Sequence, residues 1–248
     1  MKNSFRWQLI LGVSLLSLST VVYFIHFLIF RDIHHIFIYL IGDIGFVFFE
    51  VLIVTLLIHQ LLSYRDKKSM LKKLNMVIGA FFSEVGTELI KLCYAFDDEK
   101  EKNRGFLLVD TDWSRKKFKK SEIHFLNLDS SINLKNGDME ELKNFLVSKR
   151  NFLLTLLENP NLLEHESFTD LLWAVFHLTE ELVKRQSINN LPTTDLEHLA
   201  NDVKRAYASL VRQWIFYMEH LKKDYPYLFS LAVRTNPFNP DCRVEIAS

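Results

Sequence analysis

The sequence predicts an all-α fold, made of an N-terminal hairpin of two transmembrane helices, a long helix that continues from it into the cytosol and a C-terminal cytosolic helical bundle. Glycine (7) and proline (5) are scarce among the 248 residues, which favours helices over many short strands. Apolar residues crowd into the first quarter of the chain, and charged residues lie almost wholly after Tyr64. We expect four parts: a hairpin at 1–65, a juxtamembrane helix at 66–96, a linker at 97–138 and the bundle at 139–248.

The first two elements are apolar runs. The run 8–30 contains no ionised residue, and at about 1.5 Å per residue it crosses a hydrocarbon core of about 30 Å. It is too long for the apolar region of a signal peptide, and no small-x-small cleavage site follows it. The run 36–62 is longer than a span requires, so we expect it to tilt or to begin in the interface. The segment RDIHH (31–35) between them predicts a tight turn.

Lysine and arginine set the orientation of the spans. Lys2 and Arg6 precede the first span, and the turn holds Arg31 alone. A basic group follows the second span and comprises Arg65, Lys67, Lys68, Lys72 and Lys73. The positive-inside rule therefore places both termini in the cytosol and the spans in the inner (cytoplasmic) membrane. A second interpretation makes the basic group a site for anionic lipid headgroups.

Helical patterns continue after the spans. Between 66 and 93 the apolar residues recur every three or four positions, which predicts a helix with one apolar stripe. The charged segment 97–104 is a break, and 105–113 is a candidate short strand. Three long helices follow at 139–158, 167–185 and 193–223; Ser167 is the expected cap of the second, and Pro226 begins a shorter helix.

Charge and motif content exclude several classes of protein. Lysine plus arginine and aspartate plus glutamate number 30 each, and this balance argues against a nucleic-acid partner. Cys93 and Cys242 lie in the part expected in the cytosol and form neither a disulfide framework nor a metal-binding spacing. The sequence has no Gly-rich phosphate loop, nucleophile elbow or His-Glu-x-x-His motif. We therefore predict no enzymatic activity and no cofactor.

Four residues of the bundle are candidates for a metal site: His177, Glu181, His198 and Asp202. Di-iron bundles use Glu-x-x-His units whose side chains all project inward. At about 100° per residue, His198 and Asp202 lie opposite the apolar stripe of their helix, and His177 points away from the core face of its own. We therefore interpret His177–Glu181 and His198–Asp202 as i,i+4 pairs on an outer or subunit-facing surface, and we predict no metal.

Two carboxylates, Asp43 and Glu50, lie inside the second apolar run. An ionised aspartate at mid-membrane costs about 2.5–3.5 kcal/mol on insertion scales, so such residues normally face protein or water. The two share a helix face to within about 20°. Their seven-residue spacing continues through Leu71, Ile78 and Val85, as in a coiled-coil seam. If copies of this helix pack around an axis, the seam turns both carboxylates inward as acidic rings, which select cations.

A structural interpretation also accounts for these two carboxylates. A neutral Glu50 would hydrogen-bond to a hydroxyl of the first span. The candidate hydroxyls belong to Ser14, Ser17, Ser19 and Thr20. Asp43 would pair with Arg31 or His34 at the outer surface. In this interpretation the acids hold the hairpin together, and nothing is transported.

One block of the sequence resembles a known group of proteins. Residues 40–91, LIGDIGFVFFEVLIVTLLIHQLLSYRDKKSMLKKLNMVIGAFFSEVGTELIK, resemble a segment of uncharacterised prokaryotic two-span membrane proteins with a cytosolic helical domain. The block covers about a fifth of the chain. The resemblance implies membrane topology and no residue role.

The sequence supports three functional hypotheses. In the first, a homo-oligomer passes cations or protons along the second span, with Glu50 and Asp43 as the ion-binding residues and the bundle as the regulator. In the second, the spans are a tether, and the bundle is an interaction or sensor module that binds a cytosolic protein. In the third, the bundle is a metal-binding enzyme.

Overall fold

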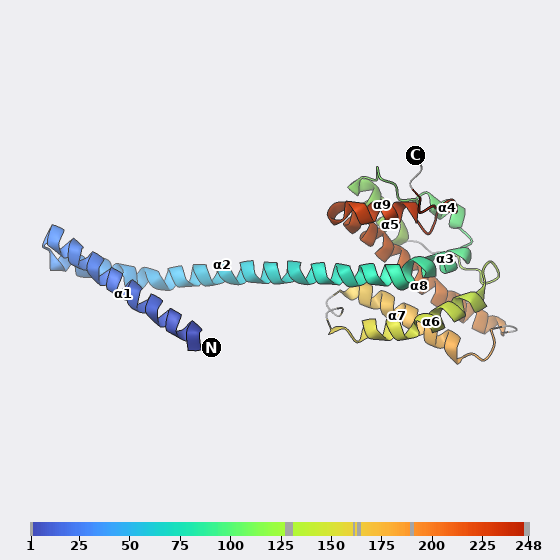
Figure 1. Ribbon diagram of the computed structural model, residues 1–248, viewed down its shortest axis with the longest axis horizontal. Coiled ribbons are helices and arrows are strands. Elements are labelled where there is room, and N and C mark those ends of the chain that lie inside the picture. Colours follow the sequence, from blue (N-terminus) through green and yellow to red (C-terminus); the bar gives the residue numbers. More distant parts are fainter. Residues whose placement is uncertain (1, 127–130, 161, 163–164, 189–190, 246–248) are drawn as a thin grey trace. The chain divides into compact units, whose positions relative to one another are not determined.

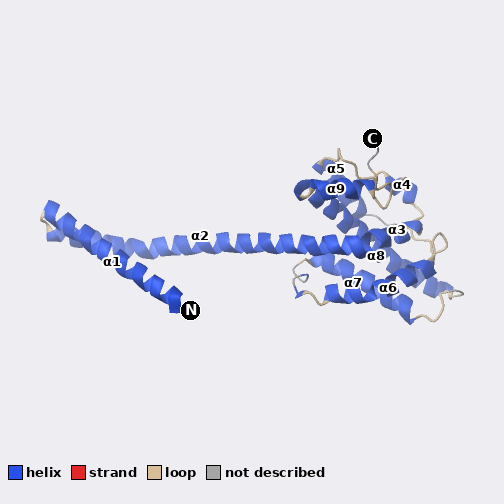
Figure 2. Ribbon diagram, viewed as in Figure 1, coloured by secondary structure: helices blue, strands red, loops and turns tan. Residues whose placement is uncertain are grey.

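A computed structural model describes residues 2–126, 131–160, 162, 165–188 and 191–245 (Figure 1). In this part of the chain every regular element is a helix, and no β-strand is present (Figure 2). The predicted all-α class is therefore confirmed. The chain divides into two compact units, Met1–Lys68 and Ser69–Ser248.

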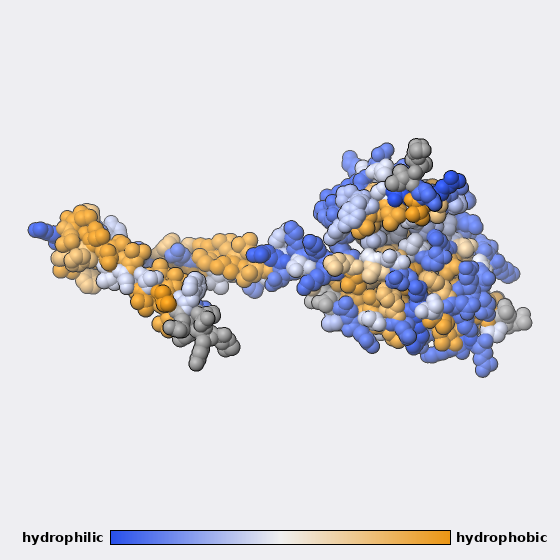
Figure 3. All heavy atoms as spheres, viewed as in Figure 1, coloured by the Kyte–Doolittle hydropathy of each residue, from blue (hydrophilic) through white to orange (hydrophobic). Residues whose placement is uncertain are grey.

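The first unit holds α1 (Lys2–Phe30) and the beginning of α2 (Ile33–Phe81). Most of its apolar side chains are exposed, and they form the orange surface over these helices in Figure 3. Trp7–Phe30 and the segment that begins at Ile33 are each long and apolar enough to cross a membrane, and the most apolar window of each is 0% buried. The core helix of a soluble protein is mostly buried, whereas these helices are not. The two helices are therefore candidate membrane spans.

A short turn joins α1 to α2 where the sequence predicts one. Arg31 ends α1 with φ at 50°, and its N–H donates to the Phe27 carbonyl oxygen at 2.8 Å. A residue in the left-handed conformation is a common helix end. Asp32 then caps α2, because its Oδ1 accepts hydrogen bonds from the backbone N–H groups of His34 at 2.9 Å and His35 at 3.2 Å.

The second unit is a helical bundle arranged about α8 (Thr193–Asp224). α8 contacts α5 (Arg115–Leu126), α7 (Glu166–Lys184) and α9 (Pro226–Arg234), and α6 (Met139–Leu157) packs on α7. Figure 1 shows α6 and α7 on one side of α8, and α5 and α9 on the other. α8 therefore buries residues on more than one face.

The apolar stripe predicted after the second span lies in the core of this bundle. It runs along the end of α2, the π-helical turn η1 (Phe82–Gly86) and α3 (Thr87–Ala95). Leu74 and Phe81 are inaccessible to solvent, and Phe81 contacts Phe168 of α7 edge-to-face at 5.4 Å. The stripe therefore fills the core of its own chain. The prediction that it forms a seam between copies is wrong from Leu74 onward.

The segment 97–138 belongs to the bundle and is not a linker. It contains α4 (Lys100–Arg104) and α5, and α5 packs on α8 with Phe118 buried. The strand predicted at 105–113 is wrong, because the backbone there forms turns and irregular structure. Leu107 and Val109 are both buried. Their alternation comes from two side chains that enter the core from an irregular segment, and among the described residues no strand lies beside it.

The three long helices α6, α7 and α8 begin and end within two residues of the predicted positions, and Pro226 lies at the start of α9, whereas α4 and α5 were not predicted. The cap of α7 differs from the prediction. Ser167 lies inside the helix, and the side chain of His165 caps it by accepting the backbone N–H of Phe168 at 3.3 Å. The imidazole nitrogen of His165 thus accepts the capping hydrogen bond that was expected to go to the hydroxyl of Ser167.

Candidate functional site

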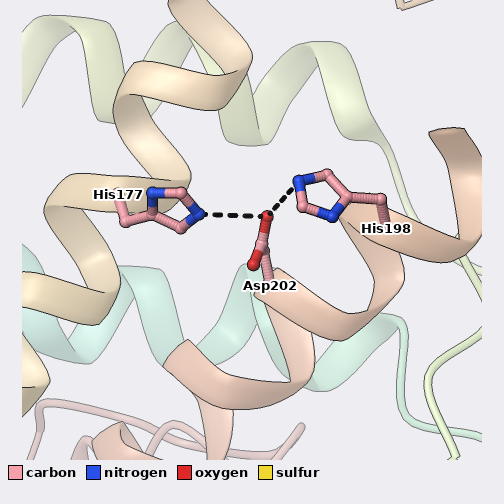
Figure 4. A group of neighbouring side chains, drawn as sticks. All are labelled: His177, His198 and Asp202. Atoms are coloured by element: carbon pink, nitrogen blue, oxygen red, sulfur yellow. Dashed lines mark ion pairs between the residues drawn. The ribbon is translucent and has the colours of Figure 1, made fainter.

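Two histidines converge on one carboxylate where α7 packs on α8. His177 comes from α7, and His198 and Asp202 come from α8 (Figure 4). Asp202 Oδ2 lies 3.5 Å from His177 Nε2 and 3.3 Å from His198 Nε2. The sequence predicted the i,i+4 pairing of His198 with Asp202, but it did not predict that His177 joins them from the neighbouring helix.

Glu181 lies beside this group, so the structure brings together all four residues considered for a metal. Its Oε1 is 4.0 Å from His177 Nε2, and its Oε2 is 3.7 Å from His198 Nε2. The predicted His177–Glu181 pair is therefore present, with its two polar atoms 4.0 Å apart. The two predicted pairs form one cluster that spans both helices.

Asp202 is buried, which corrects the prediction that it lies on an outer face. Its side chain is 2% exposed, whereas those of His177 and His198 are 45% and 51% exposed. The apolar stripe of α8 marks only one of the buried faces of that helix, and α7 covers another. The carboxylate thus forms the floor of the site, and the imidazoles form its rim.

The two oxygens of Asp202 have different surroundings. Oδ1 accepts a hydrogen bond from Arg205 Nη1 at 3.3 Å. Oδ2 is buried and has no hydrogen-bond partner among the described residues. Buried polar atoms nearly always have a partner, because they have lost their hydration. The oxygen that lacks one faces the two imidazoles.

A bidentate arginine fixes the outer side of the cluster. Arg185 donates Nη1 to Glu181 Oε2 at 2.7 Å, and Nη2 and Nε to Asp195 Oδ1 and Oδ2 at 2.6 and 3.0 Å. These hydrogen bonds lower the pKa of Glu181 and of Asp195, and the bonds to Asp195 above all raise the pKa of Arg185. Glu181 is therefore held ionised, and the end of α7 is tied to the start of α8.

A groove with a volume of about 420 Å³ lies between α7 and α8 and is lined by Asp170, Trp173, Ala174, His177, Arg205 and Ser209. Arg205 and Arg185 were missed at the sequence level. Their spacing to the acids, three residues after Asp202 and four after Glu181, is the signal that was available.

Asp43 and Glu50 are exposed on α2 in the first unit. Within the described part of the chain, neither makes a hydrogen bond or an ion pair, and Asp43 does not pair with Arg31 or His34. Three of the four hydroxyls proposed as partners of Glu50 bind their own helix instead. Ser14, Ser17 and Thr20 donate to the carbonyls of Leu11, Val13 and Leu16 at 2.8–2.9 Å. The described residues therefore supply no polar partner for either carboxylate.

The basic group after the second apolar run is also exposed. Its members are Arg65, Lys67, Lys68, Lys72 and Lys73, and all lie on α2. Exposed cations at this place are compatible with both of the predicted interpretations, the orientation signal and contact with anionic headgroups.

Comparisons with known proteins match both units. The model of "MJ1433, N-terminal helical domain" matches residues 2–62, and that of "Uncharacterized protein MJ1433, C-terminal helical domain" matches residues 70–234. Uncharacterized protein MJ1433 of Methanocaldococcus jannaschii is 46% identical over 237 residues, which cover 96% of this chain and 95% of that protein. No solved structure matches. The resemblance predicted from residues 40–91 to an uncharacterised family is confirmed and extends along nearly the whole chain.

Proposed function

This chain belongs to the family of Uncharacterized protein MJ1433 and contains both of its helical domains, and from this premise we propose that it is a membrane-anchored helical module. α1 and the first part of α2 cross the cytoplasmic membrane, and both termini lie in the cytosol. The unit Ser69–Ser248 is an interaction or sensor domain that binds a cytosolic protein.

The exposure of apolar side chains on the first unit carries this proposal. Its two helices bury almost none of their apolar surface within the chain, and soluble monomers rarely expose contiguous apolar patches of this kind. The second unit has its own apolar core. Such a division supports an anchor joined to a domain that can act on its own. The exposed basic group after Leu62 supports the cytosolic placement of that domain.

The two cysteines allow a direct test of this topology. Cys242 is exposed, whereas Cys93 is buried and desolvation raises the pKa of its thiol to about 12. A membrane-impermeant maleimide should therefore react only with Cys242 in the folded protein, and only after cells are permeabilised. Cys242→Ser should abolish this labelling, and His34→Cys in that background should restore it in intact cells. Release of the protein by a carbonate wash, or labelling of Cys242 from outside, would contradict the proposal.

The interaction role has a separate test. Residues 1–62 can be exchanged for an unrelated two-span hairpin of the same orientation. A tethered module should keep the cytosolic partners that the natural protein captures after cross-linking. Loss of every partner with a correctly folded second unit would show that the spans take part in recognition.

A second candidate function is a cation or proton pathway in a homo-oligomer. It is favoured by the isolation of Asp43 and Glu50, because carboxylates inside a membrane require polar partners and the described part of their own chain provides none. Other copies of α2 can supply them, as acidic rings along a common axis. The buried stripe limits such an axis to the part of α2 before Leu74.

The pathway is tested by mass measurement and by flux. The detergent-solubilised protein should be an oligomer, because two spans cannot enclose a pore. Glu50→Gln should change cation flux into vesicles or its dependence on pH, whereas Thr55→Ala, about 140° around the same helix from Glu50, should not. A monomer, or equal flux through the Glu50→Gln variant, would rule out this role.

A further inference from the structure

We propose that His177, His198 and Asp202 bind one divalent transition-metal ion, with Zn²⁺ as the best match. This inference goes beyond membrane anchoring and replaces our interpretation of these residues as surface ion pairs. One ligand atom from each side chain lies within 4.8 Å of the other two (Figure 4). Imidazole nitrogens and a carboxylate oxygen form a donor set that Zn²⁺ takes in proteins, and they do not suit Mg²⁺ or Ca²⁺, which prefer oxygen alone.

The spacing of the ligand atoms fits a tetrahedral ion. Zn²⁺ holds nitrogen and oxygen ligands at about 2.0–2.1 Å, which places two ligand atoms of a tetrahedron about 3.3–3.4 Å apart. The two distances from Asp202 Oδ2 to the histidine Nε2 atoms are 3.3 and 3.5 Å. Two of the three distances between ligand atoms are thus already within about 0.2 Å of the required length. Both imidazoles are half exposed, so rotation about their side-chain bonds can bring the two histidine nitrogens to the same separation.

Asp202 provides an independent indication of a ligand. A buried carboxylate oxygen normally has a hydrogen-bond donor, but Oδ2 has none among the described residues and is directed at the imidazoles. Arg205 holds the other oxygen at 3.3 Å and so fixes the orientation of the carboxylate. Ligating carboxylates are commonly held by such an outer hydrogen bond. A metal ion would bind this oxygen directly, which otherwise has only the ion-pair contacts with the two imidazoles at 3.3 and 3.5 Å.

Glu181 supports the ion from outside the ligand set. Its oxygens stay 3.7–4.0 Å from the histidine nitrogens, and Arg185 holds Oε2 at 2.7 Å. With Asp202 it would balance the two positive charges of the ion. The fourth coordination position is left to water, on the side where the groove along α7 and α8 begins at His177. Three protein ligands with an open position are typical of exchangeable or catalytic zinc rather than of closed structural sites.

A second His–Asp pair on the same helix provides a matched control. His220 Nδ1 lies 2.9 Å from Asp224 Oδ2, again with i,i+4 spacing. Asp224 is 43% exposed and no second histidine reaches it among the described residues. This pair therefore has the local sequence pattern of His198–Asp202 without the convergent third donor or the buried oxygen.

The test uses the full chain in detergent, without a histidine tag and after treatment with a chelator. Titration with Zn²⁺ by calorimetry should give one ion per chain. Co²⁺ should produce visible absorption bands of a four-coordinate site, which Zn²⁺ then removes. His177→Gln, His198→Gln and Asp202→Asn should each weaken binding by about 100-fold or more, whereas His220→Gln should leave it unchanged.

The two histidine variants keep this test decisive even if Asp202→Asn does not fold, because both side chains lie at the exposed rim. Absence of saturable binding of Zn²⁺ and Co²⁺ would overturn the proposal. Equal losses in His220→Gln and in the site variants would also overturn it, because binding would then be a general property of surface histidines. Neither outcome affects membrane anchoring, which the labelling of Cys242 tests separately.

Discussion

Replacing Phe81 with alanine should strongly destabilise the second unit. The ring is inaccessible to solvent and lies edge-to-face with Phe82 and Phe168, each at a centroid distance of 5.4 Å. Removal of a buried phenylalanine ring costs about 3–5 kcal/mol, because apolar contacts are lost and a cavity remains. At about 1.4 kcal/mol per factor of ten, the equilibrium for opening this unit rises roughly 100- to 4000-fold.

Cys93 can report this opening without interference from the candidate spans. It is fully buried, and its thiol pKa of about 12 suppresses the reactive thiolate in the folded state. In a Cys242→Ser background, its rate of modification by a thiol reagent therefore follows the population of the opened unit when reclosing is fast. The free energy of opening is obtained from this rate across a series of urea concentrations.

Leu71→Ala is the matched control, because Leu71 belongs to the same apolar stripe of α2 but is 42% exposed. We expect it to change the free energy of opening by less than about 1 kcal/mol. The effect of Phe81→Ala should also be independent of protein concentration, since the contacts lie within one chain. An effect below about 1 kcal/mol, or one that grows on dilution, would refute this assignment of the stripe to the core of its own chain.

Three further predictions use the same assay. Burial lowers the pKa of His124, whose ring stacks on Phe106 at 3.9 Å. The contribution of His124 to stability is therefore present above pH 6.5, the ordinary pKa value, and is lost as the pH falls through the lowered pKa of the folded state. His124→Gln should reduce the loss of stability on acidification, and an unchanged pH profile would contradict this. Arg185→Met should destabilise the unit, because it removes the charged hydrogen bonds to Glu181 and Asp195; an unchanged free energy of opening would show that the network is energetically neutral. Zn²⁺ at about 100 times its Kd should stabilise the unit by about 2.7 kcal/mol, and His198→Gln should abolish this gain; equal stabilisation of both proteins would mean that the ion binds elsewhere.

Local chemistry made much of the fold predictable. The turn between α1 and α2, the start of α6 and the first residue of α9 depend on side chains adjacent to the helix ends. The candidate spans depend on the length and composition of apolar runs. One missed feature depends on distant parts of the chain: the alternation at 105–113 was interpreted as a strand, although no strand lies beside it among the described residues. The other is local, because the side chain of His165, two residues before Ser167, supplies the cap of α7.

Local sequence patterns were enough to show that this protein is helical, where its candidate spans lie, and that α2 carries an apolar stripe, because helix propensity and periodicity are encoded within a few neighbouring residues. The packing of the folded chain settled what covers each helix face. It assigned the stripe to the core of its own chain, and it buried Asp202 beneath α7 so that His177 and His198 meet over one oxygen. Periodicity shows which face of a helix is apolar, but it does not show how many faces its neighbours cover.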